Sequence, residues 1–386
     1  MKNIKRGLAV LFAVAICISC SLSAFCIEIK SPDIEINAKS AVLMDANTGT
    51  LLYALNENER LAPASVTKIM TLLLVFEAID DKALKYDDIL TVSENAASMG
   101  GSQIYLEPGE SMSVDDLLKS VIVASANDAA LTLAENVAGS EDAFVEMMNK
   151  RAAELGMKNT HFENVTGLDD DVTDHLTTAY DIAIMSRELL KHEKITEYST
   201  IWMDSVRDGK FGLTNTNRLI RFYKGATGLK TGSTSKAGFC VSASAKRDGL
   251  HLIAVIMGAE TSDLRNASAA KLLDFGFANY SIFSSDKEDM GKIPVIAGKS
   301  DFVQTEAEPF EILVNKGAQN SVKKEILMPE NVSAPVNKGD VAGKIIYSIE
   351  NEKIGESNIY FTEKIDKIDF LTYLKRVVEC FLLKIK

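Results

Sequence analysis

Short apolar or alternating segments stand at both ends of residues 40–280 and predict β-strands. The first two flank Ala46-Asn-Thr-Gly49, which is typical of a hairpin turn, and the last two flank the turn at 246–249. Because helical patterns fill the chain between the two groups, we expect one antiparallel sheet assembled from distant segments. The expected strands are 41–45, 50–54, 228–232, 238–246 and 250–258.

Between these strands, apolar residues recur at helical spacing. The segment 64–79 is apolar nearly all round, so we expect a buried helix there. Ser113-Val-Asp-Asp116 resembles a capping box and predicts a helix that begins at this point. Further helices are expected at about 128–138, 141–155, 178–191 and 263–279.

From about residue 285 the pattern changes to short β-type runs separated by turn sequences, which predicts a small all-β domain over 285–362. In residues 363–386, apolar residues fall at helical spacing and basic residues outnumber acidic ones. A net-basic amphipathic helix on an acidic protein is typical of a helix that lies on an anionic membrane surface. The alternative is a terminal helix docked on the β domain, because amphipathicity fits both.

The N-terminus carries three basic residues, an apolar run over 8–18 and then small residues. This order is typical of a secretory signal peptide over 1–26, which predicts that the domain over 27–284 lies on the outer side of the cytoplasmic membrane. An uncleaved anchor is the alternative, although the run is shorter than the roughly 20 residues of a spanning helix. Cleavage is possible after Ser23, Ala24 or Cys26.

Composition excludes several other classes of protein. Apolar residues make up 46% and charged residues 25% of the 386 residues, as in ordinary folded domains. The sequence pI is about 5.0, and the body of the chain has no basic cluster, so we expect no nucleic-acid partner. The histidines show no metal-like spacing, and beyond residue 26 only Cys240 and Cys380 remain, so we expect no metal, cofactor or disulfide framework.

Three short motifs carry the candidate chemistry: Ser65-Val-Thr-Lys68, Ser125-Ala-Asn127 and Lys230-Thr-Gly232. Ser-x-x-Lys also occurs elsewhere, for example at Ser321 and Lys324, so the order and context of the motifs carry the information. Ser65 and Lys68 lie one helical turn apart, which lets a neutral lysine amine reach the serine hydroxyl. A buried lysine near other cations can lose its proton and act as this base.

The other two motifs supply candidate binding groups. Ser125 is suited to relay a proton, and Asn127 to donate to substrate amide groups. Gly232 has no side chain, so a substrate backbone could lie against the edge of its strand. Lys230 and Thr231 are suited to hold a substrate carboxylate.

The motifs and their order resemble the penicillin-recognising serine enzymes. The layout is most similar to the low-molecular-mass penicillin-binding proteins, which are serine-type D-alanyl-D-alanine carboxypeptidases. This resemblance covers residues 35–280 and implies an α+β fold with a five-stranded antiparallel sheet and helices on both faces. The matching stretches are Pro63-Ala-Ser-Val-Thr-Lys-Ile-Met-Thr71, Ala124-Ser-Ala-Asn-Asp-Ala129, Thr178-Ala-Tyr-Asp-Ile-Ala183, Gly228-Leu-Lys-Thr-Gly-Ser-Thr234 and Leu272-Leu-Asp-Phe-Gly-Phe277.

The resemblance also implies roles for individual residues. Ser65 would attack the penultimate D-Ala carbonyl of a peptidoglycan stem peptide, Lys68 would be the base, and Ser125 would relay a proton to the departing D-Ala. Water would hydrolyse the acyl-enzyme, and a β-lactam would acylate Ser65 and leave slowly. The N–H groups of Ser65 and Ser233 would form the oxyanion hole, and the carboxylate would be bound by Lys230, Thr231, Thr234 and Arg265.

Two other functions compete with this one. A serine β-lactamase of the best-known class uses a glutamate-activated water, and no Glu-x-x-Leu-Asn pattern lies between Asn127 and Lys230. A non-catalytic β-lactam sensor is disfavoured by the intact motifs. Outside the motifs, we expect Asp128 to cap a helix, Trp202 to pack, and the histidines, His175 included, to have loop or surface positions without a chemical role.

Overall fold

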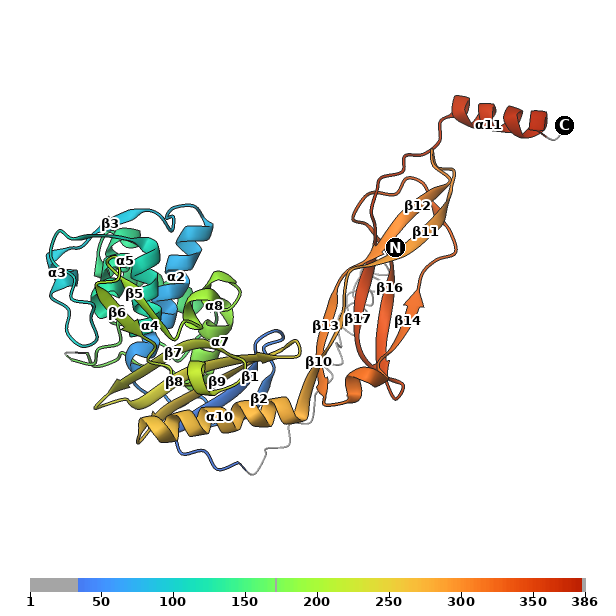
Figure 1. Cartoon of the computed structure of the whole chain (residues 1–386). Helices are drawn as coiled ribbons and strands as arrows, with labels where there is room; N and C mark the ends of the chain where they lie inside the picture. Colours follow the sequence, from blue (N-terminus) through green and yellow to red (C-terminus); the bar gives the residue numbers. More distant parts are fainter. Residues whose placement is uncertain (1–33, 171, 384–386) are drawn as a thin grey trace, which may run out of the picture. The chain divides into compact units, whose positions relative to one another are not determined.

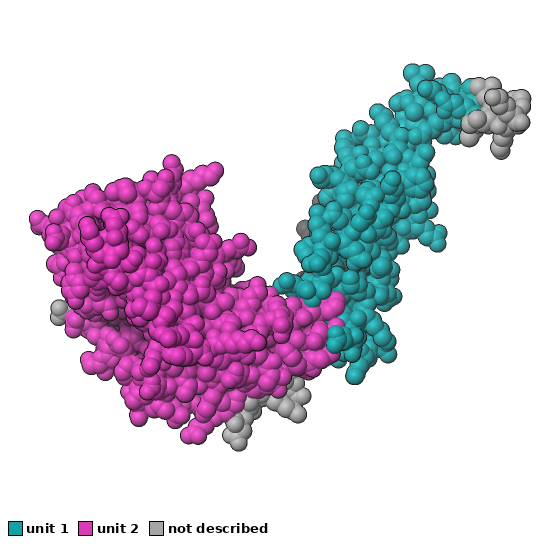
Figure 2. Space-filling view, viewed as in Figure 1, with its two compact units in different colours: residues 1–28, 284–312, 320–386 teal, residues 29–283, 313–319 magenta. Residues whose placement is uncertain are grey.

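The computed structural model describes residues 34–170 and 172–383, so the predicted signal peptide over 1–26 lies outside the described residues. The described residues form two compact units (Figure 2). The catalytic unit comprises residues 34–283 and 313–319, and the β unit comprises 284–312 and 320–383. This division falls one residue before the predicted domain boundary, and nothing in the sequence pattern indicates that 313–319 belongs with the catalytic unit.

The catalytic unit is built on a five-stranded antiparallel sheet (Figure 1). Its strand order, β2-β1-β9-β8-β7, places the N-terminal hairpin beside the late strands, as the pattern of segments predicted. The strands are β1 (Ser40–Asp45), β2 (Leu51–Leu55), β7 (Ala226–Thr234), β8 (Gly238–Arg247) and β9 (Leu250–Ala259).

Helices cover both faces of this sheet because its strands are apolar on both sides. Leu43 and Leu252 point toward Gly276 of α10 (Ser262–Asn279), where an added Cβ would approach both side chains. Their neighbours Val42 and Ile253 join the large core on the opposite face, with the helices of the middle of the chain. The predicted α+β class, with helices on both faces of a five-stranded sheet, is confirmed.

The predicted helix over 64–79 is interrupted at its beginning. It consists of a short 3-10 helix, η1 (Ala64–Thr67), followed by α2 (Lys68–Asp80). Ala64 has φ +49°, a left-handed conformation that costs a non-glycine residue about 1–3 kcal/mol. Residues 68–76 of α2 are all buried, as its nearly uniform apolar sequence predicted.

The remaining elements of the catalytic unit lie close to their predicted places, except for short ones that the pattern did not indicate. The helices expected from sequence are α4 (Val114–Ala124), α5 (Asn127–Ala138), α6 (Glu141–Glu154) and α7 (Ala179–Leu189). The short elements are α3 (Glu94–Ala97), α8 (Lys194–Ser199), α9 (Leu219–Phe222), β3 (Ile89–Thr91), β4 (Ser111–Ser113), β5 (Met203–Val206) and β6 (Phe211–Thr214).

The β unit contains a six-stranded sheet of order β14-β16-β17-β12-β11-β15 and ends in α11 (Phe370–Leu383). Strand β12 was not predicted, because its buried positions are Val303, Thr305 and Ala307, and the polar Thr305 interrupts the apolar alternation expected of a strand. Among residues 34–170 and 172–383, no helix combines the length and apolarity needed to cross a bilayer. The strands are β11 (Glu288–Ile296), β12 (Phe302–Ala307), β14 (Lys323–Leu327), β15 (Val332–Ser333), β16 (Val341–Ile349) and β17 (Glu352–Phe361), with β10 (Tyr280–Ser285) and β13 (Phe310–Asn315) paired separately and η2 (Ala318–Ser321) after them.

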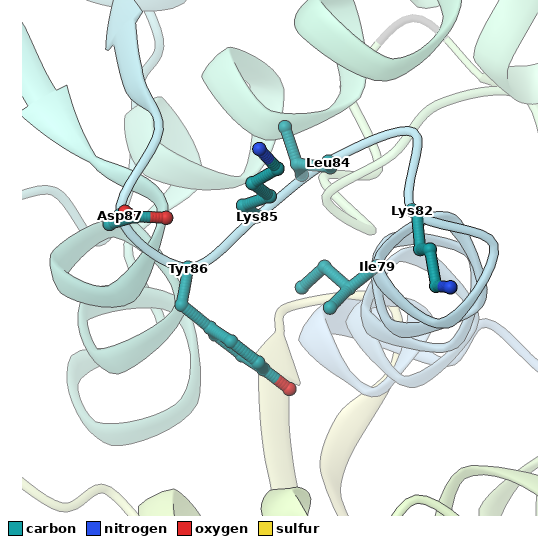
Figure 3. Close-up of a pocket in the computed structure, with 6 residues that line it drawn as sticks. All are labelled: Ile79, Lys82, Leu84, Lys85, Tyr86 and Asp87. Atoms are coloured by element: carbon teal, nitrogen blue, oxygen red, sulfur yellow. The ribbon is translucent and has the colours of Figure 1, made fainter.

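A pocket of about 380 Å³ lies where the chain leaves α2. Figure 3 shows Ile79 at its wall, with Tyr86 and the lysines on the segment that follows. None of the site residues predicted from sequence lines this pocket.

Candidate active site

Ser65 and Lys68 meet as their spacing predicted. Ser65 lies in η1 and is partly exposed, whereas Lys68 opens α2 and is completely buried. Lys68 Nζ lies 3.0 Å from Ser65 Oγ and donates a second hydrogen bond to the carbonyl oxygen of Thr166 at 2.9 Å. A reachable hydroxyl thus faces an amine that water does not reach.

The surroundings of Lys68 favour its neutral form. Burial holds the pKa of the Lys68 amine well below its usual range, and the positive charge of Lys230 lowers it further. The carboxylate of Asp128 acts in the opposite direction and does not reverse the shift. A neutral amine has a lone pair and can accept the serine proton.

Strand β7 contacts η1 directly at Gly232. We call η1 and α2 together the catalytic helix. A Cβ at this position would come within 2.7 Å of the backbone nitrogen of Ser65 and 2.9 Å of the Pro63 oxygen. The sequence interpretation kept this space for a substrate backbone. The structure adds a second reason for the glycine, which is the close approach of β7 to η1.

The third motif gathers buried positive charge. Lys230 is 1% exposed and donates to the Thr231 carbonyl oxygen at 2.9 Å. Burial lowers the pKa of Lys230 to about 7, and the nearby charge of Arg265 adds to this effect. Arg265, at the beginning of α10, is 5% exposed, and no carboxylate pairs with it among the described residues. These buried cations lack an anion, which a substrate carboxylate would supply.

Hydroxyl groups adjoin these cations. Thr231 Oγ1 donates to Thr216 Oγ1 at 2.8 Å. Thr234 Oγ1 accepts from the Ala237 N–H at 3.1 Å, which leaves its own proton free to donate, and Ser233 is exposed. Thr216 was not identified from sequence, because an isolated threonine 15 residues from Thr231 carries no signal of the contact.

Ser125 and Asn127 lie at the corner between α4 and α5. Ser125 ends α4 in the left-handed conformation with φ +63°, and no hydrogen bond joins its hydroxyl to Ser65 or Lys68 among the described residues. Asn127 Nδ2 donates to the Gly100 oxygen at 2.7 Å, whereas its buried Oδ1 has no partner within the described part of the chain. Asn127 therefore has a free acceptor, and the second N–H of its Nδ2 is still left for the donor role that the motif predicted.

Asp128 and His175 are both buried and make hydrogen bonds to distant segments that the sequence did not indicate. Asp128 is buried and accepts the backbone N–H groups of Ile104 and Leu106, so it fastens a distant loop in addition to accepting an N–H on its own helix. His175 lies in a loop, as expected, but it is only 3% exposed, which corrects the surface alternative. Its Nε2 lies 2.8 Å from Thr67 Oγ1 on the catalytic helix.

Comparisons with known proteins agree with this geometry. Residues 27–261 match the family model described as D-alanyl-D-alanine carboxypeptidase, of the peptidase S11 type. Residues 277–367 match the model of the C-terminal domain of penicillin-binding protein 5. The chain is 48% identical over 356 residues to the D-alanyl-D-alanine carboxypeptidase DacF of Bacillus subtilis, covering 90% of this chain and 91% of that protein.

Solved structures give the same result. Penicillin-binding protein 5 of Haemophilus influenzae superposes with a TM-score of 0.73 at 33% identity, covering 87% of this chain and 99% of that one. Penicillin-binding protein D2 of Listeria monocytogenes, in its ampicillin-bound form, gives 0.59 at 32% identity and covers 64% of this chain and 100% of that one. The expected family, enzyme class and main function are thereby confirmed: the chain belongs to the serine-type D-alanyl-D-alanine carboxypeptidase family of low-molecular-mass penicillin-binding proteins.

Proposed function

We propose that this chain removes the terminal D-Ala from peptidoglycan stem peptides through an acyl-enzyme on Ser65. The observation that carries the proposal is the 3.0 Å contact between a partly exposed Ser65 hydroxyl and the completely buried amine of Lys68. As Ser65 Oγ attacks the carbonyl of the penultimate D-Ala, its proton moves to the neutral Lys68 amine. The oxyanion that forms is stabilised by the N–H groups of Ser65 and Ser233.

Collapse of this intermediate breaks the peptide bond. The proton held by Lys68 passes through the Ser125 hydroxyl to the nitrogen of the departing D-Ala. A water molecule then attacks the ester carbonyl on Ser65 and gives up a proton to Lys68. Lys68 passes this proton to Ser65 Oγ as the ester bond breaks and the shortened peptide leaves. The enzyme returns to its starting protonation state, and one water is consumed for each D-Ala released.

The substrate is held at its two polar ends. The terminal carboxylate lies against Lys230 and Arg265, with the hydroxyl of Thr234 as a donor. The Thr231 hydroxyl already donates to Thr216 Oγ1 and would have to exchange this bond to join them. The unpartnered Oδ1 of Asn127 accepts an N–H from the peptide. The unpaired buried cations explain why a free terminal carboxylate is required.

A β-lactam would acylate the same serine. Opening of the lactam ring leaves an ester on Ser65 in which the leaving nitrogen stays tethered, so water displaces it slowly. The structure of the Listeria monocytogenes relative with ampicillin bound supports this expectation.

The direct test is release of free D-Ala from a peptide ending in D-Ala-D-Ala. Wild type should release D-Ala, and Ser65→Ala should lower the rate by at least about 10³-fold. Ser321→Ala is the matched control, because Ser321 opens an unrelated Ser-x-x-Lys sequence in the β unit. A folded wild-type protein that released no D-Ala, or an active Ser65→Ala variant, would contradict the proposal.

We also propose that residues 1–26 direct export and that α11 holds the enzyme on the outer face of the cytoplasmic membrane. Phe370 and Leu371 of α11 are 76% and 75% exposed, and Lys375 beside them is also exposed. Arg376 bonds to Asp301 at 2.7 Å, which joins this helix to the β unit and leaves its apolar side chains free to enter a lipid surface.

Sedimentation with anionic vesicles tests the membrane role. The full chain without residues 1–26 should sediment with phosphatidylglycerol vesicles, and further deletion of 364–386 should leave it in the supernatant. Equal sedimentation of both proteins, or of neither, would contradict the role of α11. D-Ala release, measured without lipid, should be the same for both.

A further inference from the structure

A loop over residues 163–168 lies against the catalytic helix. Gly167 presses on the residue before Ser65, since an added Cβ would lie 1.8 Å from the Ala64 oxygen. The Val165 carbonyl oxygen accepts from Thr71 Oγ1 at 2.7 Å. The loop is therefore packed along the same helix turns that carry the nucleophile and the base.

The loop is held in shape by one side chain, the carboxamide of Asn164. Its Oδ1 accepts from the N–H of Gly167 at 2.7 Å and from the N–H of Thr166 at 3.1 Å. Its Nδ2 donates to the Leu168 oxygen at 2.8 Å. These bonds fix the peptide units on both sides of Thr166, whose carbonyl oxygen accepts from Lys68 Nζ at 2.9 Å.

That carbonyl controls the orientation of the amine. A neutral amine has two N–H groups and one lone pair. When one N–H is held by the Thr166 oxygen, rotation about the terminal carbon–nitrogen bond is restricted, and the lone pair can be kept toward Ser65 Oγ. A displaced carbonyl would let the amine rotate its lone pair away from the serine proton.

We propose that Asn164 is a positioning residue for Lys68: by fixing the Thr166 carbonyl, it keeps the lone pair of the neutral amine directed at Ser65. The inference rests on the proposed role of Lys68 as the base. It adds a residue outside the three sequence motifs, one that touches neither substrate nor the reacting atoms.

The effect differs from general support of the loop. Asn149 of α6 makes two comparable bonds just before the loop, to the N–H and oxygen of Phe162 at 2.9 and 2.8 Å. Neither bond involves Thr166 or Gly167, whose N–H groups bind Asn164 and so fix the Thr166 carbonyl. Asn149→Ala is therefore a matched control that removes the same number of atoms and a similar anchor.

The test measures acylation by benzylpenicillin under single-turnover conditions, separating the limiting rate from the concentration for half-saturation. Asn164→Ala should lower the limiting rate by about 10- to 100-fold, because misplacement of a catalytic group by about 1 Å has effects of this size. The benzylpenicillin concentration that gives half of the limiting rate should change by less than about twofold. Asn149→Ala should leave both quantities within about twofold of wild type, even if its melting temperature falls.

Asn164→Asp keeps the oxygen that accepts from Thr166 and Gly167, replaces the donor to the Leu168 oxygen and adds a charge. Its limiting rate should stay within about threefold of wild type, as expected for a retained turn. The charged groups that act on Lys68, namely Lys230 of β7 and Asp128 of α5, are unchanged in both variants. The added carboxylate stabilises the ammonium, so the acidic limb of the pH–rate profile should move to higher pH. In Asn164→Ala the displaced Thr166 carbonyl no longer accepts from the Lys68 ammonium, so the acidic limb of the profile should move to lower pH.

Equal losses in Asn164→Ala and Asn149→Ala would overturn the proposal, as would wild-type acylation by Asn164→Ala. Should Asn164→Ala not fold, Asn164→Asp decides alone, since a loss above about tenfold in this folded variant contradicts a role of the accepting oxygen. Failure of the proposed function is a separate result, because wild type itself would then neither be acylated nor release D-Ala.

Discussion

The two compact units differ most clearly in where they keep their charges. The catalytic unit buries ionisable groups, among them Lys68, Lys230, Arg265 and Asp128. In the described part of the β unit, no Lys, Arg, Asp, Glu or His is buried. Its charges lie at the surface in pairs such as Lys344–Glu356 at 3.1 Å.

This contrast separates what the fold needs from what the chemistry needs. Burying an ammonium or guanidinium group without a paired anion costs several kcal/mol. The β unit folds into a six-stranded sheet with no such group in its described core, so the same chain can form stable structure without them. The buried cations of the catalytic unit are therefore not needed to form a stable sheet, which agrees with the binding and catalytic roles proposed for them.

The largest expected effect comes from removing the buried amine. Lys68→Met should lower acylation by benzylpenicillin by at least about 10³-fold, since the serine loses its base. It should also raise the melting temperature, because an apolar chain of similar length replaces a desolvated amine. Lys324→Met in the β unit, where Lys324 is exposed and pairs with Glu288 at 3.0 Å, is the control and should change neither quantity appreciably. A lower melting temperature of Lys68→Met would contradict the claim that the buried amine does not contribute to stability.

The next effect concerns the contact between β7 and the catalytic helix. Gly232→Ala would place a Cβ 2.7 Å from the Ser65 nitrogen, so Ser65 must shift. We expect an acylation rate about 10- to 100-fold lower, from the displaced nucleophile and oxyanion donor. Gly212→Ala is the control, since no atom lies within 4 Å of a Cβ there. Equal rates for the two variants would show that the close approach has no catalytic consequence.

A smaller effect should appear in the pH dependence of stability. The pKa of Lys230 is lowered by burial from 10.5 to about 7 in the folded state. Between these values the unfolded chain binds more protons than the folded one, so the free energy of unfolding should increase as the pH rises from about 7 toward 10.5. Urea unfolding at several pH values would measure this slope. Lys230→Met should reduce the slope, and an unchanged slope would mean that Lys230 is not desolvated.

The smallest effect is expected at the surface of the β unit. Glu356 pairs with Lys344 and with Lys353, and all three side chains are about half exposed. Glu356→Gln should change the free energy of unfolding by no more than about 1 kcal/mol and leave D-Ala release unaltered. A loss of activity would show that the two units are functionally coupled.

Sequence reasoning succeeded where side chains carry a periodic or motif signal. The sheet and long helices followed from apolar periodicity, and the pairing of Ser65 with Lys68 from their spacing. The contribution of Thr166 could not be predicted, because a backbone carbonyl has no residue signature. The packing of Gly232 against η1 was not predicted, because the sequence does not say which segment lies against a strand. The break between η1 and α2 was also not predicted, since the apolar pattern continues across it.

The central claim is that Ser65 is the nucleophile and is activated by the neutral amine of Lys68. Intact-mass and peptide mass spectrometry after incubation with benzylpenicillin tests it most directly. We predict one adduct with the mass of the whole antibiotic, located on Ser65, that persists for minutes and forms far more slowly in Lys68→Met. An adduct on another residue, or equally fast formation in Lys68→Met, would contradict it.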